Sequence, residues 1–315
     1  MATRRIVSPR SPFALPSRGI IISRPYTRSH LTVQSQVPLK YDHFTPPEEG
    51  RDARDSPIVF MHGLFGFKRN FRAVSQALAR DLKRHVYAVD LRNHGESPHA
   101  RHHTYPAMSD DVVGFIENLQ LQNPTLIGHS MGAKVAMTLA LTHPALLAYL
   151  IAVDNAPVES PLNHDFWTYM QGMTAIDTGH YTSRKDVDRV FSTYVSDPLV
   201  RHFLLANLTR VPSPDGPYRF QFPVLTLRKA LVRLGKFPFH DPEATHFDKP
   251  ALFIRGTRSH YVSDKVLPLT RRFFPNMQLV DIDCGHWVIS EKPQPFMEAV
   301  KTFLREQESK SPKQE

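Results

Sequence analysis

From Pro38 onward the sequence alternates short apolar segments with longer amphipathic ones. The apolar segments have the length of β-strands, and they lie at residues 57–61, 85–89, 125–127, 149–153, 250–254 and 278–280. Parallel neighbours in a sheet cannot be joined by a tight turn and need a crossover, usually a helix. We therefore predict an α/β fold with a mostly parallel central sheet and helices on both faces.

The amphipathic segments predict the crossover helices. Apolar residues recur at spacings of three and four from Phe71 to Leu82 and again from Val112 to Leu119. We expect the second of these helices to begin near Ser109, where Asp110 and Asp111 complement the positive helix end. Further helices are predicted at 132–142 and at the C-terminus, around 296–304.

The alternation stops between residue 155 and about residue 248, where polar and aromatic helical segments and Pro-rich loops replace it. We interpret residues 156–248 as an inserted helical lid, and residues 38–155 and 249–305 as the core. The charged tail at 306–315 is expected to be disordered.

Length and composition fit one large domain, since 315 residues with 41% apolar composition can bury a sizeable core. The longest apolar run, residues 145–153, is too short to cross a membrane as a helix. Cys284 is the only cysteine, which excludes an intramolecular disulfide and suits a reducing compartment.

The N-terminal arm carries much of the net charge of +9. Its first 27 residues contain no acidic residue and five arginines, namely Arg4, Arg5, Arg10, Arg18 and Arg24. Such a composition is typical of a mitochondrial transit peptide, so we predict import to the matrix and a mature start near Thr27 or Arg28. The alternative is a disordered basic tail, because several prolines interrupt any long helix. With the charge concentrated in this arm, we do not expect nucleic-acid binding.

Gly128-His129-Ser130-Met131-Gly132 fits G-x-S-x-G, in which a strained strand-to-helix turn pushes the serine clear of the sheet. The pattern alone is common by chance. Here it follows an apolar strand and precedes a helix, as the motif requires. We predict that Ser130 is a nucleophile, and a serine that only caps the helix is the simpler alternative.

A serine hydroxyl needs a base, and His286 is our candidate. It lies in Asp283-Cys284-Gly285-His286-Trp287, a loop between the last apolar strand and the C-terminal helix. Cys284 and Trp287 are interpreted as packing residues. The oxyanion needs N–H donors, for which we predict Met131, directly after the nucleophile, and Leu64 in His62-Gly63-Leu64-Phe65-Gly66. We expect His62 to organise that loop.

The pattern resembles the α/β-hydrolase superfamily, and within it the branch of bacterial YbfF-type esterases, mitochondrial abhydrolase domain-containing protein 11 and yeast mitochondrial ethanol acetyltransferases. The resemblance extends over about residues 40–304. Its marks are the stretches 62–66 with Asn70-Phe71, 90–97 (DLRNHGES), 128–134 (GHSMGAK), 153–157 (VDNAP), 201–208 (RHFLLANL) and 285–287 (GHW).

The triad acid is chosen partly through this resemblance. Many superfamily members place it after the strand that ends here near Ile254, but residues 255–261 (RGTRSHY) contain no carboxylate, and Asp264 comes later than expected. This chain is similar to the branch, whose members place the triad acid at the end of the strand after the nucleophile helix. The residue at that position here is Asp154. Asp90 is interpreted as a brace for the loop that contains Arg92, and Asp281 and Asp283 as solvated loop carboxylates.

The resemblance implies a serine esterase or thioesterase whose substrate is a small ester or thioester, including acyl-CoA, and which uses no cofactor or metal. The segment 99–103 (HARHH) is interpreted as a solvated loop and not a metal site. An alcohol O-acetyltransferase making ethyl acetate from acetyl-CoA and ethanol is the first alternative, because it shares the acyl-enzyme step. A protein that mainly binds a mitochondrial enzyme complex is the second. No oligomeric state is predicted.

Overall fold

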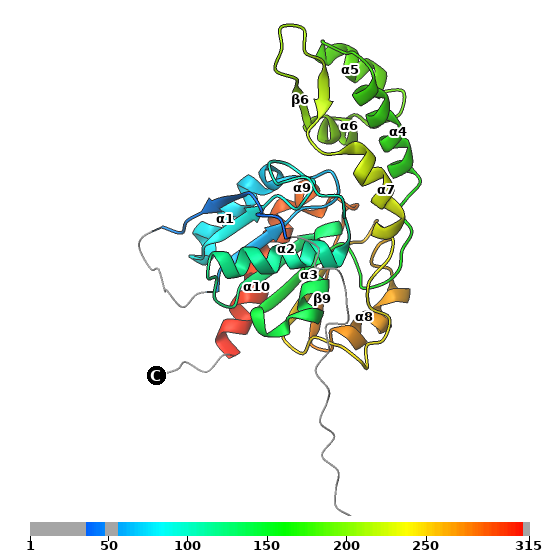
Figure 1. Ribbon diagram of the computed structural model, residues 1–315. Coiled ribbons are helices and arrows are strands. Elements are labelled where there is room, and N and C mark those ends of the chain that lie inside the picture. Colours follow the sequence, from blue (N-terminus) through cyan, green and yellow to red (C-terminus); the bar gives the residue numbers. More distant parts are fainter. Residues whose placement is uncertain (1–35, 48–55, 311–315) are drawn as a thin grey trace, which may run out of the picture. The chain divides into compact units, whose positions relative to one another are not determined.

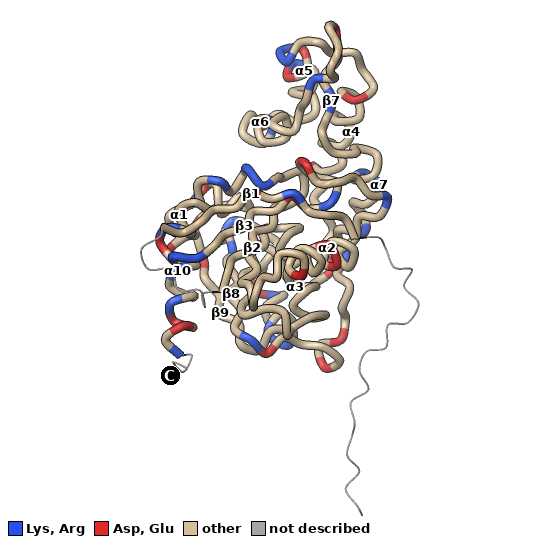
Figure 2. Tube along the Cα trace, turned by 60° about the vertical axis from the view of Figure 1, so that its left-hand side comes forward, with Lys and Arg blue, Asp and Glu red and all other residues tan. Residues whose placement is uncertain are grey.

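The computed structural model describes residues 36–47 and 56–310 (Figure 1). The predicted transit peptide at 1–27 and the end of the predicted tail, 311–315, lie outside the described residues. Figure 2 shows lysine and arginine spread over many elements of the described chain, interspersed with aspartate and glutamate. Within the described residues no helix combines the length and the apolar character needed to span a membrane.

The central sheet of the described chain has seven strands in the order β1-β3-β2-β4-β5-β8-β9. Only β1 is antiparallel to its neighbour, so the predicted mostly parallel sheet is confirmed. The strands are β1 (Tyr41–Phe44), β2 (Ile58–Met61), β3 (Val86–Val89), β4 (Thr125–His129), β5 (Tyr149–Val153), β8 (Ala251–Gly256) and β9 (Met277–Ile282).

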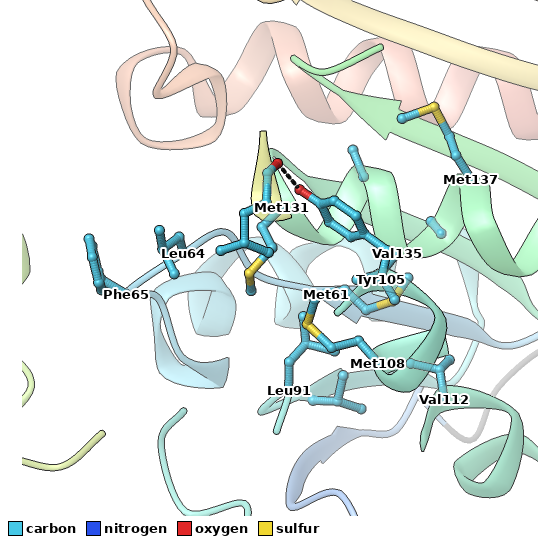
Figure 3. Packing of buried hydrophobic residues seen from close by; sticks show 14 of the residues in the cluster. Met61, Leu64, Phe65, Leu91, Tyr105, Met108, Val112, Met131, Val135 and Met137 are labelled. Atoms are coloured by element: carbon cyan, nitrogen blue, oxygen red, sulfur yellow. Dashed lines mark hydrogen bonds between the residues drawn. The ribbon is translucent and has the colours of Figure 1, made fainter. Parts of the chain in front are cut away.

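Helices cover both faces of this sheet, because successive strand side chains point to opposite faces. Val59 and Met61 of β2 join one apolar cluster with α2 (Tyr105–Asn118) and α3 (Met131–Thr142). Ile58 and Phe60 join the other, with α1 (Arg72–Leu82) and α10 (Pro293–Lys310). Figure 3 shows part of the first cluster, where methionine and aliphatic side chains pack around Tyr105. The shorter helices of the core are α8 (Leu267–Phe273) and α9 (Val288–Glu291).

Two helix boundaries differ from the prediction. Helix α2 begins at Tyr105 and not near Ser109, because the Thr104 side chain caps it by accepting from the N–H of Ala107. Helix α10 continues to Lys310, so residues 306–310 are helical where a disordered tail was expected. The last turns still pack on the core, since Gln307 is buried and Glu308 pairs with Arg84.

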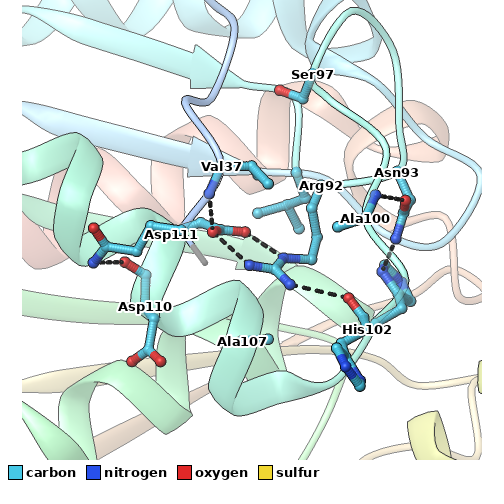
Figure 4. A network of polar contacts seen from close by, with 12 residues as sticks. Val37, Arg92, Asn93, Ser97, Ala100, His102, Ala107, Asp110 and Asp111 are labelled. Carbon is cyan, nitrogen blue, oxygen red and sulfur yellow. Dashed lines mark hydrogen bonds and ion pairs between the residues drawn. The ribbon is translucent and has the colours of Figure 1, made fainter. Parts of the chain in front are cut away.

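Asp111, expected near the start of α2, instead lies inside the helix and is buried with Arg92 (Figure 4). Arg92 Nε and Nη2 donate to its two carboxylate oxygens over 2.5 and 2.6 Å. Arg92 also donates to the carbonyl of His102, which draws the following His103 into the protein. The segment 99–103 is therefore not a fully solvated loop.

The segment predicted as a lid, residues 156–248, enters between β5 and β8, and we call it the inserted segment. It contains a two-stranded antiparallel sheet that the sequence pattern did not reveal. Its elements are α4 (Asp165–Thr178), α5 (Arg184–Phe191), α6 (Pro198–Leu205), β6 (Leu208–Arg210), β7 (Tyr218–Phe220) and α7 (Val224–Leu234).

Candidate active site

Ser130 lies between β4 and α3 with φ 54° and ψ −114°. A serine rarely adopts this backbone conformation, and close packing of the two motif glycines holds it. A Cβ on Gly128 would come within 2.2 Å of the Gly132 carbonyl oxygen, and a Cβ on Gly132 within 2.5 Å of the Met61 carbonyl oxygen. Both positions therefore require glycine, as the G-x-S-x-G pattern predicts.

The structure brings Ser130, His286 and Asp154 together. His286 Nε2 lies 2.9 Å from Ser130 Oγ, and His286 Nδ1 lies 2.6 Å from Asp154 Oδ2. A carboxylate oxygen accepts hydrogen bonds, so His286 donates to Asp154 through Nδ1, which leaves Nε2 free to accept from the serine hydroxyl. The hydrogen bonds have the arrangement needed for a serine nucleophile, a base and an orienting acid.

Asp154 is fully buried at the end of β5, with φ 49°. Its carboxylate accepts from the backbone N–H of Gly256 over 3.0 Å and from the hydroxyl of Ser259 over 2.5 Å. Gly256 is the last residue of β8, and Ser259 lies in the loop that follows, where the sequence has no carboxylate. The end of β8 and its loop therefore supply donors to Asp154 on the neighbouring strand, a role that sequence reasoning did not assign to them.

The other carboxylates considered for this role lie elsewhere. Asp264 is 84% exposed and accepts from Arg255, not from His286. Asp281 lies in β9 and also pairs with Arg255, so it is not the loop carboxylate that we expected. Asp90 is buried and accepts from the backbone N–H of Glu96, in agreement with its predicted role as a brace.

Two aromatic side chains that the sequence analysis did not single out support His286. His129 is buried, and its Nε2 donates to the His286 carbonyl over 2.9 Å. Burial, and next the nearby His286, lower the pKa of His129 to about 4, so it stays neutral. The ring centroids of Tyr261 and His286 lie 4.4 Å apart. Cys284 is buried with its pKa raised to about 11, mainly by burial, and is a packing residue as predicted.

The loop of residues 62–66, which we call the oxyanion loop, lies against the serine. A Cβ on Gly63 would be 3.2 Å from the Cβ of Ser130. His62 organises the loop, as predicted: its Nε2 accepts from the N–H of Leu91 over 3.0 Å, so its Nδ1 donates to the Gly63 carbonyl over 2.8 Å. Burial lowers the pKa of His62, which keeps Nε2 unprotonated and able to accept.

Met131 directly follows Ser130 and begins α3, where its first-turn N–H has no acceptor within the helix. Leu64, the other predicted donor, lines the same pocket as Ser130. Figure 3 labels both residues. Their role toward an oxyanion remains a prediction.

A pocket of about 360 Å³, partly open to solvent, lies over Ser130 and His286. The inserted segment supplies one wall through α4 and α6, and the core supplies the other. Trp287, predicted only to pack, lines this pocket and meets Phe203 edge to face at 4.6 Å. The lining consists of Gly63, Leu64, Phe65, His129, Ser130, Phe166, Tyr169, Val200, Phe203, Leu204, His286 and Trp287.

Comparison with known proteins identifies the family of this chain. A family model described as alpha/beta hydrolase fold matches residues 56–293. A probable alcohol acetyltransferase of Saccharomyces cerevisiae is 40% identical, over 87% of this chain and 86% of the yeast protein. The sn-1-specific diacylglycerol lipase ABHD11 of Mus musculus is 38% identical, over 80% of this chain and 82% of the mouse protein. The solved structure of a marine microorganism esterase has a TM-score of 0.77 at 30% identity, and covers 85% of this chain and 100% of the esterase.

Proposed function

Because the chain belongs to the α/β-hydrolase fold family, we propose that it is a serine esterase or thioesterase that works through Ser130, His286 and Asp154. Its relatives include a lipase and an acetyltransferase of the branch that its motifs resemble, which fits an enzyme of the esterase or acyltransferase class. One observation carries the proposal. A single imidazole contacts the serine hydroxyl through Nε2 and a buried carboxylate through Nδ1.

In this mechanism Ser130 Oγ bonds to the acyl carbon while His286 Nε2 takes the hydroxyl proton. The N–H groups of Leu64 and Met131 donate to the oxyanion. The bond to the leaving alcohol or thiol then breaks, and His286 returns the proton to it. Water attacks the acyl-enzyme with His286 as base, which releases the acid and restores Ser130. Asp154 stabilises the imidazolium that forms in each half-reaction.

The lining of the pocket supports an uncharged acyl group, because it contains no lysine, arginine, aspartate or glutamate among the described residues. A charged acyl chain would lose its hydration there without gaining a partner. We therefore propose esters or thioesters of uncharged acyl groups as substrates.

Transfer of an acetyl group from acetyl-CoA to an alcohol is the second candidate, favoured by the similarity to the yeast probable alcohol acetyltransferase. Both reactions pass through the same acyl-enzyme, and only the acceptor differs. Product analysis with acetyl-CoA, with and without ethanol, separates them. Hydrolysis yields acetate at the same rate in both samples, whereas transfer yields ethyl acetate only when ethanol is present.

The serine is tested by Ser130→Ala. We expect this variant to lose hydrolysis of short p-nitrophenyl esters, because no other group at this turn can form the acyl-enzyme, and loss of a triad member costs several orders of magnitude. Labelling by a fluorophosphonate should disappear with it, while the melting temperature stays close to that of the wild type. Activity within about tenfold of wild type would reject the mechanism.

We also propose that residues 1–27 direct import into mitochondria and are then removed. The proposal rests on the arginine-rich, acid-free composition of this arm. N-terminal sequencing of the protein from isolated mitochondria should give a start near Thr27 or Arg28. Recovery of matrix protein that still begins at Met1 or Ala2 would contradict it.

A further inference from the structure

The oxyanion loop is tied to the inserted segment by one side chain, that of Asn207. Its amide Nδ2 donates to the backbone carbonyl of Phe65 over 2.9 Å. Asn207 follows α6, whose residues form one wall of the pocket. Phe65 follows Leu64, the proposed oxyanion donor. The contact therefore joins an element of the inserted segment to the backbone that would stabilise the transition state.

The hydrogen bonds continue from Phe65 to Leu64 through two peptide groups. In a trans peptide the carbonyl and the N–H point in opposite directions, and no described residue has a cis peptide. The Phe65–Gly66 peptide accepts from Asn207 at its carbonyl, and its N–H donates to the Gly63 carbonyl over 3.0 Å. The Gly63 carbonyl, which accepts that hydrogen bond, and the Leu64 N–H belong to the same peptide group. Hydrogen bonds in such a series polarise and orient one another.

Phe65 itself needs external support in this series. Its φ of 63° is in the left-handed region, which a large side chain rarely occupies. Its N–H donates to His94 Nε2 over 3.1 Å, and its carbonyl is held by Asn207. Removing the Asn207 contact would leave a strained residue with one of its two backbone anchors.

The hydrogen bonding of the Asn207 side chain indicates that folding stability alone does not explain why an asparagine lies at this position. The residue is 1% exposed, and its Nδ2 also donates to the Leu204 carbonyl over 3.2 Å. Its Oδ1, however, is buried without a hydrogen-bond partner in the described part of the chain. Flipping the amide would place Oδ1 against two carbonyl oxygens, so the orientation is fixed. An unsatisfied buried acceptor is destabilising, and an apolar side chain would avoid that penalty.

We propose that Asn207 is a positioning residue that holds and polarises the Leu64 N–H through the Phe65–Gly66 and Gly63–Leu64 peptides. In this way, the docking of the inserted segment sets the strength of the oxyanion site. The inference rests on the proposed function, since it assumes an acyl transfer at Ser130. It adds a residue that never touches the substrate but acts on the transition state.

The test compares an ester with its thionoester, in which sulfur replaces the carbonyl oxygen. Sulfur is a weak hydrogen-bond acceptor, so a thionoester gains little from the oxyanion donors. We expect Asn207→Leu to lower kcat for the ester about tenfold, less than the 10²–10³ that deletion of a whole donor costs, with KM unchanged. Thionoester turnover should stay within about twofold, so the ester-to-thionoester ratio of kcat/KM falls about tenfold.

Two further variants keep the test decisive. Asp177→Ala removes a bond within the inserted segment, where the Asp177 carboxylate accepts from the Phe220 N–H over 2.9 Å, and should leave the ratio unchanged. Asn207→Asp keeps the shape but loses the donor. Its activity relative to wild type should rise as the pH falls, because a protonated carboxyl can donate to the Phe65 carbonyl.

The outcomes separate the two proposals. If Ser130→Ala loses turnover but Asn207→Leu keeps the wild-type ratio, only the role of Asn207 is overturned. If Asp177→Ala lowers the ratio as much as Asn207→Leu does, general loosening of the inserted segment explains the effect, and the role of Asn207 is again overturned. Turnover retained in Ser130→Ala overturns both proposals.

Discussion

At the scale of single residues, the site depends on backbone conformations that are unfavourable in isolation. Ser130 and Asp154 both have positive φ, at the ends of the adjacent strands β4 and β5. The Ser130 N–H donates to the Val153 carbonyl over 2.9 Å, and the Asp154 N–H donates to the Ile254 carbonyl over 2.8 Å. Each strained residue is thus anchored to the next strand, which fixes the distance between nucleophile and acid.

The assignment of Asp154 as the triad acid leads to a prediction for two variants. Asp154→Asn should lower kcat by about 10⁴, as neutralising the triad acid of a serine protease does, because the imidazole then adopts the wrong tautomer. Asp264→Asn, the matched control, should remain near wild type, since its exposed carboxylate pairs with Arg255 and not with His286. Steady-state kinetics on the two variants with one p-nitrophenyl ester decide the matter. The reverse ranking would place the acid after β8.

Sequence reasoning located the residues with the strongest local signals. Ser130 was identified by its motif, and His286 by its position before the last helix. Asp154 was identified by its position at a strand end together with the family resemblance. Ser259 and Asn207 have no such signal. A serine in a loop and an asparagine after a helix are common, and their partners lie 105 and 142 residues away. Only the folded chain brings these pairs together.

At the scale of elements, the turn between β4 and α3 holds Ser130 in place. Gly132 packs on the carbonyls of Met61 and His62 at the end of β2, where the oxyanion loop begins. Helix α3 and the oxyanion loop are therefore in direct backbone contact. Any side chain at this position would push them apart.

This contact predicts the effect of added methyl groups. Gly128→Ala and Gly132→Ala should each destabilise the protein by about 1–3 kcal/mol or more, because the new Cβ meets backbone atoms that cannot move aside. Gly114→Ala in α2 is the control, since its Cβ would meet only the flexible Gln36 side chain. It should be neutral or stabilising by up to about 1 kcal/mol. Urea unfolding measures all three, and equal effects would contradict the packing argument.

The sequence pattern predicted the strands of the core better than the inserted segment. In the core, apolar runs such as that of β5 coincide with the observed strand. A strand that is buried on both faces has a continuous run of apolar residues, which is easy to detect in the sequence. The strands β6 and β7 have three residues each and lie in a polar stretch of sequence, where no period is detectable. The start of α2 was misplaced because the acidic pair was taken as a helix-end signal, whereas Asp111 is the buried partner of Arg92.

At the scale of the whole molecule, stability depends on four buried histidines that stay neutral. Burial is the main cause that lowers the pKa of each histidine. The pKa falls to about 3 for His103 and to about 4 for His129, and the pKa values of His62 and His94 are lowered as well. In the unfolded chain their pKa returns to about 6.5. Below that pH the unfolded state binds protons that the folded state does not, so stability falls as the pH falls.

The loss is about 1.4 kcal/mol per pH unit for each such histidine. We predict a steep fall in the free energy of unfolding between about pH 6 and pH 4, the window that the values for His103 and His129 define. Carboxylates contribute to any acid unfolding, so the specific test is His103→Asn. This variant should flatten the slope by about 1.4 kcal/mol per pH unit, as measured by urea unfolding at several pH values. A slope equal to that of the wild type would contradict the prediction.

The inserted segment and the core form one catalytic unit in this mechanism. The core supplies Ser130, Asp154 and His286, and the inserted segment forms one wall of the pocket and holds the oxyanion loop through Asn207. Variation in the inserted segment can then change the acyl group and the acceptor without changing the triad. This is consistent with relatives that include both a lipase and an acetyltransferase.

The central claim is that Ser130 carries the acyl group during turnover. Rapid acid quenching of a reaction with p-nitrophenyl acetate or acetyl-CoA, followed by peptide mass spectrometry, tests it directly. We predict one acetyl group on the peptide that contains Ser130, and none in Ser130→Ala under the same conditions. Turnover with the acetyl group on another residue, or sustained turnover by Ser130→Ala, would contradict it.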